Sequence, residues 1–207
     1  MTLPSVLHAE ALTTLREWVA ATADQEALRT RYVAHLEAHA DGERRSCFPD
    51  HLTAGTLVLS ATGDQVLLNL HRKAGRWFAF GGHLEPGDAN LAAAALREAR
   101  EESGVVDLDL HPEPVHLDEH VVGFCDPRGD VHHLDVRFAA SAPAGVRHEA
   151  SDESLDVRWW PVDALPDGLE DEMHVLIGLA RDRLSSRDQS TSPGGSSTWA
   201  AADQPSR

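Results

Sequence analysis

The stretch that decides the fold runs from Gly81 to Val105 and reads Gly-Gly-His-Leu-Glu-Pro-Gly-Asp, Ala-Asn-Leu-Ala-Ala-Ala-Ala-Leu, Arg-Glu-Ala-Arg-Glu-Glu-Ser-Gly-Val. Glycines concentrate in its first part, which predicts a loop that turns sharply and approaches a ligand closely. The alanine run at 92–95, flanked by apolar residues at helical spacing, predicts a helix. Gly104 is the expected left-handed stop. The sequence therefore predicts a glycine-rich loop followed directly by a helix.

Three carboxylates lie on one face of this predicted helix. Glu98, Glu101 and Glu102 stand at positions i, i+3 and i+4, so their Cβ atoms are expected about 5–6 Å apart. Like charges this close repel one another, and hard divalent cations prefer oxygen ligands of this kind. The helix face therefore predicts a metal site. A solvated helix end in an acidic protein is the alternative, and the preceding glycine loop makes it the weaker one.

The whole stretch resembles the Nudix box, in which Gly, five residues, Glu and seven further residues precede Arg-Glu-apolar-x-Glu-Glu-x-Gly-apolar. The second half of the pattern is matched completely from Arg97 to Val105. The first half departs from it: counted from Gly82, the glutamate position falls on Asp88, and eight residues separate Asp88 from Arg97. We expect the extra residue to lengthen either the loop or the helix entry around Asp88 to Leu91, with Asp88 or Asn90 as N-cap.

The resemblance implies an α+β Nudix fold, with a mixed β-sheet sandwiched between helices. It also implies hydrolysis of a diphosphate bond in a nucleoside diphosphate derivative, by attack of water on phosphorus, with Mg2+ or Mn2+ as cofactor. The implied metal ligands are Gly82, Glu98, Glu101 and Glu102. Arg97 would orient the glutamates by charge-assisted hydrogen bonds. The implied catalytic residues are Arg97, Glu98, Glu101, Glu102 and Glu153.

Glu153 belongs to an acidic loop outside the box, and Nudix proteins often draw an extra glutamate from such a loop as base or metal ligand. A plain solvated loop acid is the alternative for this residue. The general base therefore stays open among Glu98, Glu102 and Glu153.

Residues before the box are candidates for substrate binding. Arg72 and Arg76 flank a turn, and this cationic cluster in an acidic chain is predicted to face substrate phosphates. A solvated turn has about equal weight. Phe80 immediately precedes the glycines of the box. Phe80, Phe78 and Trp77 are the candidates to stack on a base.

The pair His132 and His133 invites a metal-binding interpretation. Neighbouring residues on a strand point to opposite faces, whereas metal ligands must converge, so this interpretation is disfavoured. His133 and Asp135 share one face of the predicted strand. If that face lines the cleft, both residues are substrate candidates.

Composition limits the classes of partner. The 207 residues carry a formal net charge of −16, and Lys73 is the one lysine. Binding to a nucleic-acid polymer requires many cations, so we expect no such partner and a small nucleotide-like substrate instead. Cys47 and Cys125 have no motif spacing and no apolar signal segment is visible, which favours a cytoplasmic protein. No segment is long enough to span a membrane.

Periodicity divides the chain into three parts. Residues 1–46 are predicted to be an N-terminal helical extension, 47–185 the Nudix hydrolase domain, and 186–207 a disordered tail. The extension should hold two helices between 7 and 40, with a break at 22–24. Its role is left open among packing, specificity and a possible homodimer surface, with packing preferred. Strands are predicted at 56–60, 65–71, 105–110, 115–124, 131–140 and 155–160, and a last helix at 171–184.

Two other functions compete with hydrolysis. A non-catalytic Nudix-fold sensor of a nucleotide or metabolite is the alternative that the irregular box supports, whereas the intact run from Arg97 to Glu102 opposes it. A prenyl diphosphate isomerase of the same fold would need a catalytic cysteine beside a carboxylate. Neither Cys47 nor Cys125 has such a local pattern.

Overall fold

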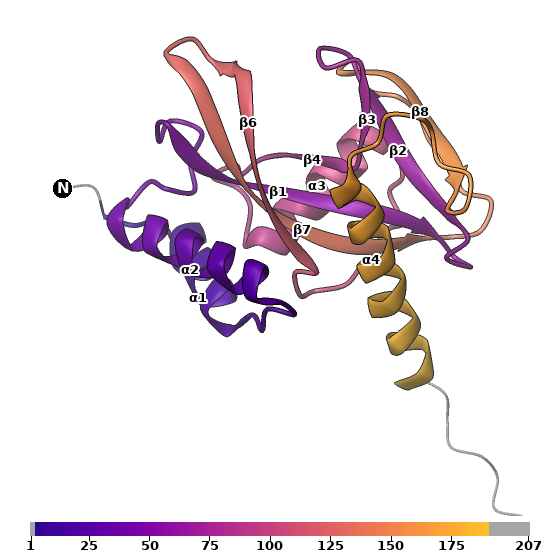
Figure 1. Ribbon diagram of the computed structural model, residues 1–207, viewed down its shortest axis with the longest axis horizontal. Coiled ribbons are helices and arrows are strands. Elements are labelled where there is room, and N and C mark those ends of the chain that lie inside the picture. The colour runs from indigo at the N-terminus through magenta and orange to yellow at the C-terminus, as the bar shows by residue number, and fades with distance from the viewer. Residues whose placement is uncertain (1–2, 191–207) are drawn as a thin grey trace, which may run out of the picture.

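The computed structural model describes residues 3–190, which form four helices and eight strands. The helices are α1 (Val6–Glu17), α2 (Ala23–Ala38), α3 (Leu91–Ser103) and α4 (Asp171–Ser190). The strands are β1 (Asp50–Ser60), β2 (Gln65–His71), β3 (Arg76–Phe78), β4 (Phe80–His83), β5 (Asp109–Leu110), β6 (His116–Asp126), β7 (Gly129–Ala142) and β8 (Ser154–Pro161). Figure 1 shows a curved sheet with helices on both sides, so the predicted α+β fold is confirmed.

All eight strands belong to one mixed sheet, whose central path is β3-β2-β1-β7-β5. β1 and β7 are parallel and pair along their lengths, from Asp50 with His132 to Ser60 with Ala142. β4 pairs antiparallel with the first half of β1, and β2 with its second half. β6 pairs with β7 and β8 with β2. β1 is therefore the strand whose register places the side chains of β4 and β7.

Alternate residues of β1 face different helices, as the two-residue period of a strand requires. Ala54 packs in one core cluster with residues of α3, and the Thr56 hydroxyl donates to the carbonyl of Ala95 in that helix at 2.9 Å. On the opposite face, Leu59 packs in a second cluster with Leu176 of α4. α3 and α4 therefore enclose the sheet from its two sides (Figure 1).

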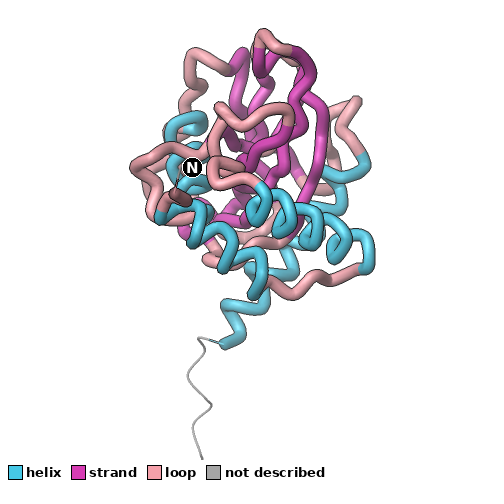
Figure 2. Tube along the Cα trace, turned by 90° about the vertical axis from the view of Figure 1, so that its left-hand side faces the viewer, coloured by secondary structure: helices cyan, strands magenta, loops and turns pink. Residues whose placement is uncertain are grey.

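The two N-terminal helices share a core with the sheet. Leu15 of α1 and Leu36 of α2 are buried in the same cluster as Val136 of β7. The Gln25 side chain of α2 pairs with the backbone of Leu117 in β6: its amide donates to the carbonyl at 2.9 Å, and its carbonyl accepts the N–H at 2.7 Å. In Figure 2 the helices nearest the viewer lie below the strands. The helices expected between 7 and 40 are present, and they pack against the sheet.

Two expectations about local structure are wrong. Gly81 and Gly82 lie on β4 and not in a loop, and the strand expected at 105–110 is reduced to Asp109–Leu110. A Cβ on Gly81 would lie 2.8 Å from the Cα of Gly55 on β1. Glycine is therefore needed at position 81. The backbones of β4 and β1 approach too closely there for a side chain, and a glycine inside a strand often marks such an approach.

The last helix is longer than predicted. α4 reaches Ser190, so residues 186–190 of the segment predicted to be disordered are helical. The rest of that segment, residues 191–207, lies outside the described residues. Among residues 3–190, no helix combines the length and the apolar character that crossing a membrane requires.

The shared core predicts that α1 contributes strongly to stability. Replacing Leu15, which is fully buried, with Ala should lower the free energy of unfolding by about 2–5 kcal/mol, because it removes buried methyl groups and leaves a cavity. Leu3 is 85% exposed, so Leu3→Ala is a matched control that should change stability by less than about 0.5 kcal/mol. Urea unfolding measures both. Equal effects would show that α1 is an appendage and not part of the core.

Candidate active site

β4 and α3 are in contact beside the centre of the sheet, and this contact builds the candidate active site. The Gly81 N–H donates to Oε2 of Glu102 at 3.0 Å. A Cβ on Gly82 would lie 2.7 Å from the carboxyl carbon of Glu98, so glycine leaves the space that this carboxylate fills. The two glycines of the box thus hold carboxylates of α3 against the strand.

The three carboxylates of α3 differ in exposure. Glu102 is buried, Glu98 is half-buried and Glu101 is exposed. Burial, together with the negative charges of Glu98, Glu153 and Glu101, raises the pKa of Glu102 to about 8 despite its backbone hydrogen bond. Burial also raises the pKa of Glu98. Carboxylates crowded in this way fit a divalent cation, because it supplies the positive charge and the oxygen coordination that they lack.

The positively charged guanidinium of Arg97 lies among these carboxylates. Its guanidinium donates to both oxygens of Asp88 at 3.0 Å each. It also donates to Glu98 at 2.9 Å, to Glu101 at 3.1 Å, and to the carbonyl of His83 at 2.9 Å. These hydrogen bonds hold Glu98 and Glu101 beside the guanidinium. The orienting role that the box pattern implies for Arg97 stays a prediction.

The turn before α3 absorbs the extra residue of the box. The Asp88 N–H donates to the carbonyl of Glu85, and the Asp88 carboxylate accepts the Glu85 N–H at 2.8 Å. Asn90 is the N-cap, since its side-chain oxygen accepts the Ala93 N–H at 2.8 Å. Of the two predicted caps, the structure therefore selects Asn90. Asp88 remains free to reach Arg97 from outside the helix.

Glu153 approaches the box from the loop between β7 and β8. Its charge raises the pKa of both Glu98 and Glu102, so it lies within electrostatic range of them. Arg72 positions this loop, because its guanidinium donates at 2.9 Å to each of the carbonyls before and after Glu153. The role of Glu153 as base or ligand stays a prediction, and so does phosphate binding by Arg72.

Two other substrate candidates have partners within the protein, and phosphate binding by Arg76 stays a prediction. Arg76 forms an ion pair with Glu170 at 2.8 Å, just before α4. Phe80 is 1% exposed and packs in a core cluster with Leu67 and Ala99. The prediction that Phe80 stacks on a base is therefore wrong: its side chain points from β4 into the core between the sheet and α3.

His133 and Asp135 lie on one face of β7, as predicted. Both carboxylate oxygens of Asp135 accept hydrogen bonds within the protein. Oδ1 accepts one from the Thr53 hydroxyl and Oδ2 accepts one from the Nε–H of Arg137, each at 2.9 Å. Contact of either residue with substrate stays a prediction.

Three residues that the sequence analysis missed surround His133. His51, His83 and Cys125 bring their potential ligand atoms and that of His133 within 4.8 Å of one another. Burial, reinforced by neighbouring histidines, lowers the pKa of His133 to about 2 and that of His83 to about 4, so both imidazoles are neutral. The ligands come from four different strands. No local spacing could have revealed them. The sequence analysis paired His133 with the adjacent His132, which is not part of this cluster.

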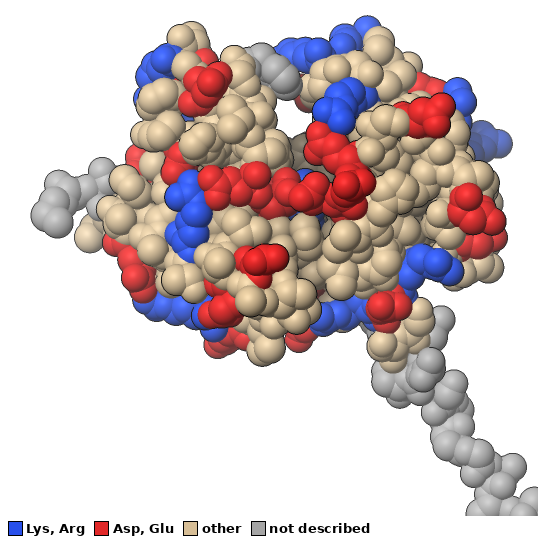
Figure 3. All heavy atoms as spheres, in the orientation of Figure 1, with Lys and Arg blue, Asp and Glu red and all other residues tan. Residues whose placement is uncertain are grey.

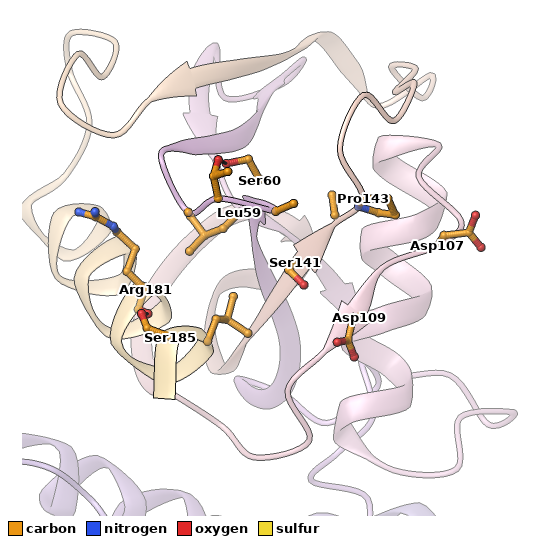
Figure 4. A pocket seen from close by; sticks show the side chains of 13 residues that line it. Leu59, Ser60, Asp107, Asp109, Ser141, Pro143, Arg181 and Ser185 are labelled. Atoms are coloured by element: carbon orange, nitrogen blue, oxygen red, sulfur yellow. Dashed lines mark hydrogen bonds between the residues drawn. The ribbon is translucent and has the colours of Figure 1, made fainter. Parts of the chain in front are cut away.

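The hollow that Figure 3 shows and the cavity that Figure 4 shows lie in different parts of the molecule. The hollow in Figure 3 lies between the β6–β7 hairpin and the layer of β2, β3 and β8, with acidic side chains along its lower edge. A cavity of about 390 Å³ lies at the C-terminal ends of β1 and β7, where Leu59, Ser141 and Arg181 line it (Figure 4). The carboxylates of α3 are absent from its lining. It is therefore distinct from the candidate active site.

A curved mixed sheet between α3 and α4, with glycines of β4 set against carboxylates of α3, is the architecture of a Nudix protein. A family model described as the NUDIX domain matches residues 49–177. The chain belongs to the Nudix family.

Solved structures share this fold. They include a NUDIX-family hydrolase from Clostridium perfringens (24% identity, TM-score 0.50, covering 65% of this chain and 97% of that chain). An Ap4A hydrolase from C. elegans matches at 19% identity and a TM-score of 0.51, covering 65% and 98%. The E. coli dihydroneopterin triphosphate pyrophosphohydrolase matches at 16% identity and a TM-score of 0.51, covering 66% and 95%. At sequence identities this low, the similarity to these structures shows a shared fold and nothing more.

The Arg97 contacts predict a structural role for Asp88. Asp88→Ala should lower the free energy of unfolding by about 1–3 kcal/mol, because it removes two charge-assisted hydrogen bonds from a partly buried guanidinium. Asp156→Ala is the control: Asp156 pairs with Arg158 on the surface, and losing that pair should cost less than about 1 kcal/mol. Chemical unfolding of both variants compares them. An unchanged Asp88→Ala protein would contradict the role assigned to this pair.

Proposed function

We propose that this protein is a metal-dependent hydrolase that cleaves a diphosphate bond in a nucleoside diphosphate derivative by attack of water on phosphorus. Membership of the Nudix family supports the coarser class, a pyrophosphohydrolase acting on phosphorus anhydrides. The observation that carries the proposal is the crowding of Glu98, Glu101 and Glu102 beside the glycines of β4. A protein that only bound a metabolite would not need this arrangement of carboxylates.

The donor set fits Mg2+ or Mn2+. Glu98, Glu101 and Glu102 supply carboxylate oxygens from one rigid helix, and Gly82 would add a backbone carbonyl. The space above Gly82 is filled by the Glu98 carboxylate and admits no Cβ. When bound, the cation would withdraw charge from phosphate oxygens and would acidify or position a water molecule.

The chain's own residues would perform the remaining tasks. Arg97 holds Glu98 and Glu101 in place through its guanidinium, and the N–H of Gly81 fixes Glu102. The proton released by the attacking water would pass to a carboxylate of this group or to Glu153. Catalysis of this kind consists mainly of positioning and charge stabilisation.

We propose a small nucleotide-like substrate and a cytoplasmic location. Both cysteines are free thiols, as is usual in a reducing compartment. A homodimer formed through the N-terminal helices stays a prediction. The chain boundaries proposed for the hydrolase domain, 47–185, enclose the matched residues 49–177.

The decisive experiment measures phosphate-containing products from a panel of substrates with Mg2+ or Mn2+. The panel should include a dinucleoside polyphosphate and dihydroneopterin triphosphate, because the C. elegans and E. coli neighbours are named for hydrolysis of such compounds. ADP-ribose, nucleotide sugars and oxidised nucleoside triphosphates complete it. Metal-dependent cleavage of one class supports the proposal. No cleavage, with a panel member raising the melting temperature, would favour a sensor instead.

Glu102→Gln separates catalysis from folding. Turnover should fall by about 100-fold or more, since a carboxylate that would hold the cation becomes a neutral amide. The melting temperature of the metal-free protein should rise at about pH 9, because the variant removes a buried charge and keeps an oxygen to accept the Gly81 N–H. Glu10→Gln, an exposed change on α1, should leave both quantities unaltered. Normal turnover of Glu102→Gln at matched Mg2+ would overturn the metal assignment.

A pair of glycine variants tests the space beside Glu98. Gly82→Ala should reduce turnover by about tenfold or more, because the new Cβ would lie 2.7 Å from the Glu98 carboxyl carbon and displace that group. In Gly87→Ala the added Cβ meets nothing within 4 Å, so turnover should be retained. Steady-state kinetics with increasing Mg2+ measures both. Equal turnover of the two variants would contradict the proposed position of Glu98.

A further inference from the structure

Four side chains that can bind a transition metal converge from four strands of the sheet. His51 on β1 lies directly opposite His133 in the parallel pairing of β1 and β7. His83 ends β4, and Cys125 belongs to the irregular part of the β6–β7 hairpin, where the register shifts between Val122 and Asp126. Irregularities of this kind redirect side chains. The cluster is therefore a product of strand register and not of a local motif.

The distances within the cluster are short and nearly symmetrical. The Sγ atom of Cys125 lies 3.4 Å from Nε2 of His83 and 3.4 Å from Nε2 of His133. The three imidazole rings of His51, His83 and His133 have centroids 5.1 Å apart in each pairing. These side chains thus surround one common point.

His51 adds a polar atom without a partner. Its Nδ1 lies 3.1 Å from the carbonyl of Cys47. A carbonyl only accepts hydrogen bonds, so Nδ1 carries the proton and Nε2 carries the lone pair. That Nε2 atom is buried and has no hydrogen-bond partner among residues 3–190, and the His51 side chain is fully buried. A histidine that donates to a carbonyl through one nitrogen and presents the other as a lone pair has the form of a metal ligand.

We propose that His51, His83, Cys125 and His133 bind one transition-metal ion, with Zn2+ as the expected occupant. Three imidazoles and one thiolate suit a borderline-soft cation, whereas the carboxylates of α3 suit a hard one. Neither the Nudix-domain match nor the proposed hydrolysis requires this second site, and its test is independent of activity.

The geometry fits tetrahedral coordination. Zn–N distances of about 2.0–2.1 Å and a Zn–S distance of about 2.3 Å place neighbouring ligand atoms about 3.3–3.6 Å apart. The two S–N distances of 3.4 Å agree with this range. The largest separation within the cluster is at most 4.8 Å, so a small rotation of side chains completes the set. Binding would release one proton, from the Cys125 thiol to solvent, as the metal–sulfur bond forms.

The site would fasten the β6–β7 hairpin to β1 and β4. His83 follows Gly82 directly, and its carbonyl accepts a hydrogen bond from Arg97. A metal bound at His83 would therefore stiffen the end of β4 that lies against the carboxylates of α3. The expected role is structural, because all four coordination positions are filled by the protein.

Cobalt(II) provides a direct test. The full chain, treated with a chelator and kept reduced, should bind Co2+ and develop thiolate-to-cobalt charge-transfer absorption in the near ultraviolet with tetrahedral visible bands. One equivalent of Zn2+ should abolish this spectrum. Cys125→Ser should remove the charge-transfer band, and His133→Ala should weaken Co2+ binding by about tenfold or more. Cys47→Ser, a matched change of the other buried cysteine, should retain the full spectrum.

Glu101→Gln distinguishes the two metal sites. It alters the carboxylate face and should leave the charge-transfer band intact, so a band that depends on Glu101 would overturn the assignment. A wild-type protein without the band, or a Cys125→Ser protein that keeps it, would also overturn the proposal.

A measurement on the unchanged chain covers the case in which variants fold poorly. Zn2+ should protect Cys125 from alkylation and leave Cys47 unprotected, as peptide mass spectrometry can show. Equal alkylation of Cys125 with and without Zn2+ would refute the site.

Discussion

The close approach of β4 to α3 is the constraint on which the candidate active site depends. Gly81 and Gly82 carry no side chains, so the strand lies directly against the carboxylates of Glu102 and Glu98. β4 can take this position because β1 holds it by antiparallel pairing in the centre of the sheet. A helix of carboxylates and a strand of glycines are thus two halves of one site, and neither half would bind a cation in the same way alone.

Charge balance around this contact explains why the irregular box is tolerated. Arg97 holds Asp88, Glu98 and Glu101 at once, whereas the buried Glu102 carboxylate accepts a hydrogen bond from the backbone N–H of Gly81. The extra residue is absorbed in the turn that Asn90 closes, so Asp88 still reaches the guanidinium. The uncompensated charge remains on the helix face, where a divalent cation would stabilise it.

β4 is also where two different metal chemistries would meet. Gly82 faces the carboxylate oxygens of α3, and the next residue, His83, faces the imidazoles and the thiol gathered by β1, β6 and β7. Successive residues of a strand point to opposite faces, which keeps the two donor sets apart. Oxygen donors select hard cations and nitrogen–sulfur donors select softer ones, so the two proposed sites would bind different metals.

The sequence by itself determined the features that follow from local pattern. The alanine-rich helix, its stop at Gly104, the position of three glutamates on one face, the two N-terminal helices and the family resemblance all follow from residues close together in the chain. Only the tertiary structure decided which residues become neighbours across strands. Phe80 lies in the core because of the face it occupies on β4, and His51, His83, Cys125 and His133 converge because the register of four strands aligns them. Register depends on long-range pairing, which local sequence does not encode.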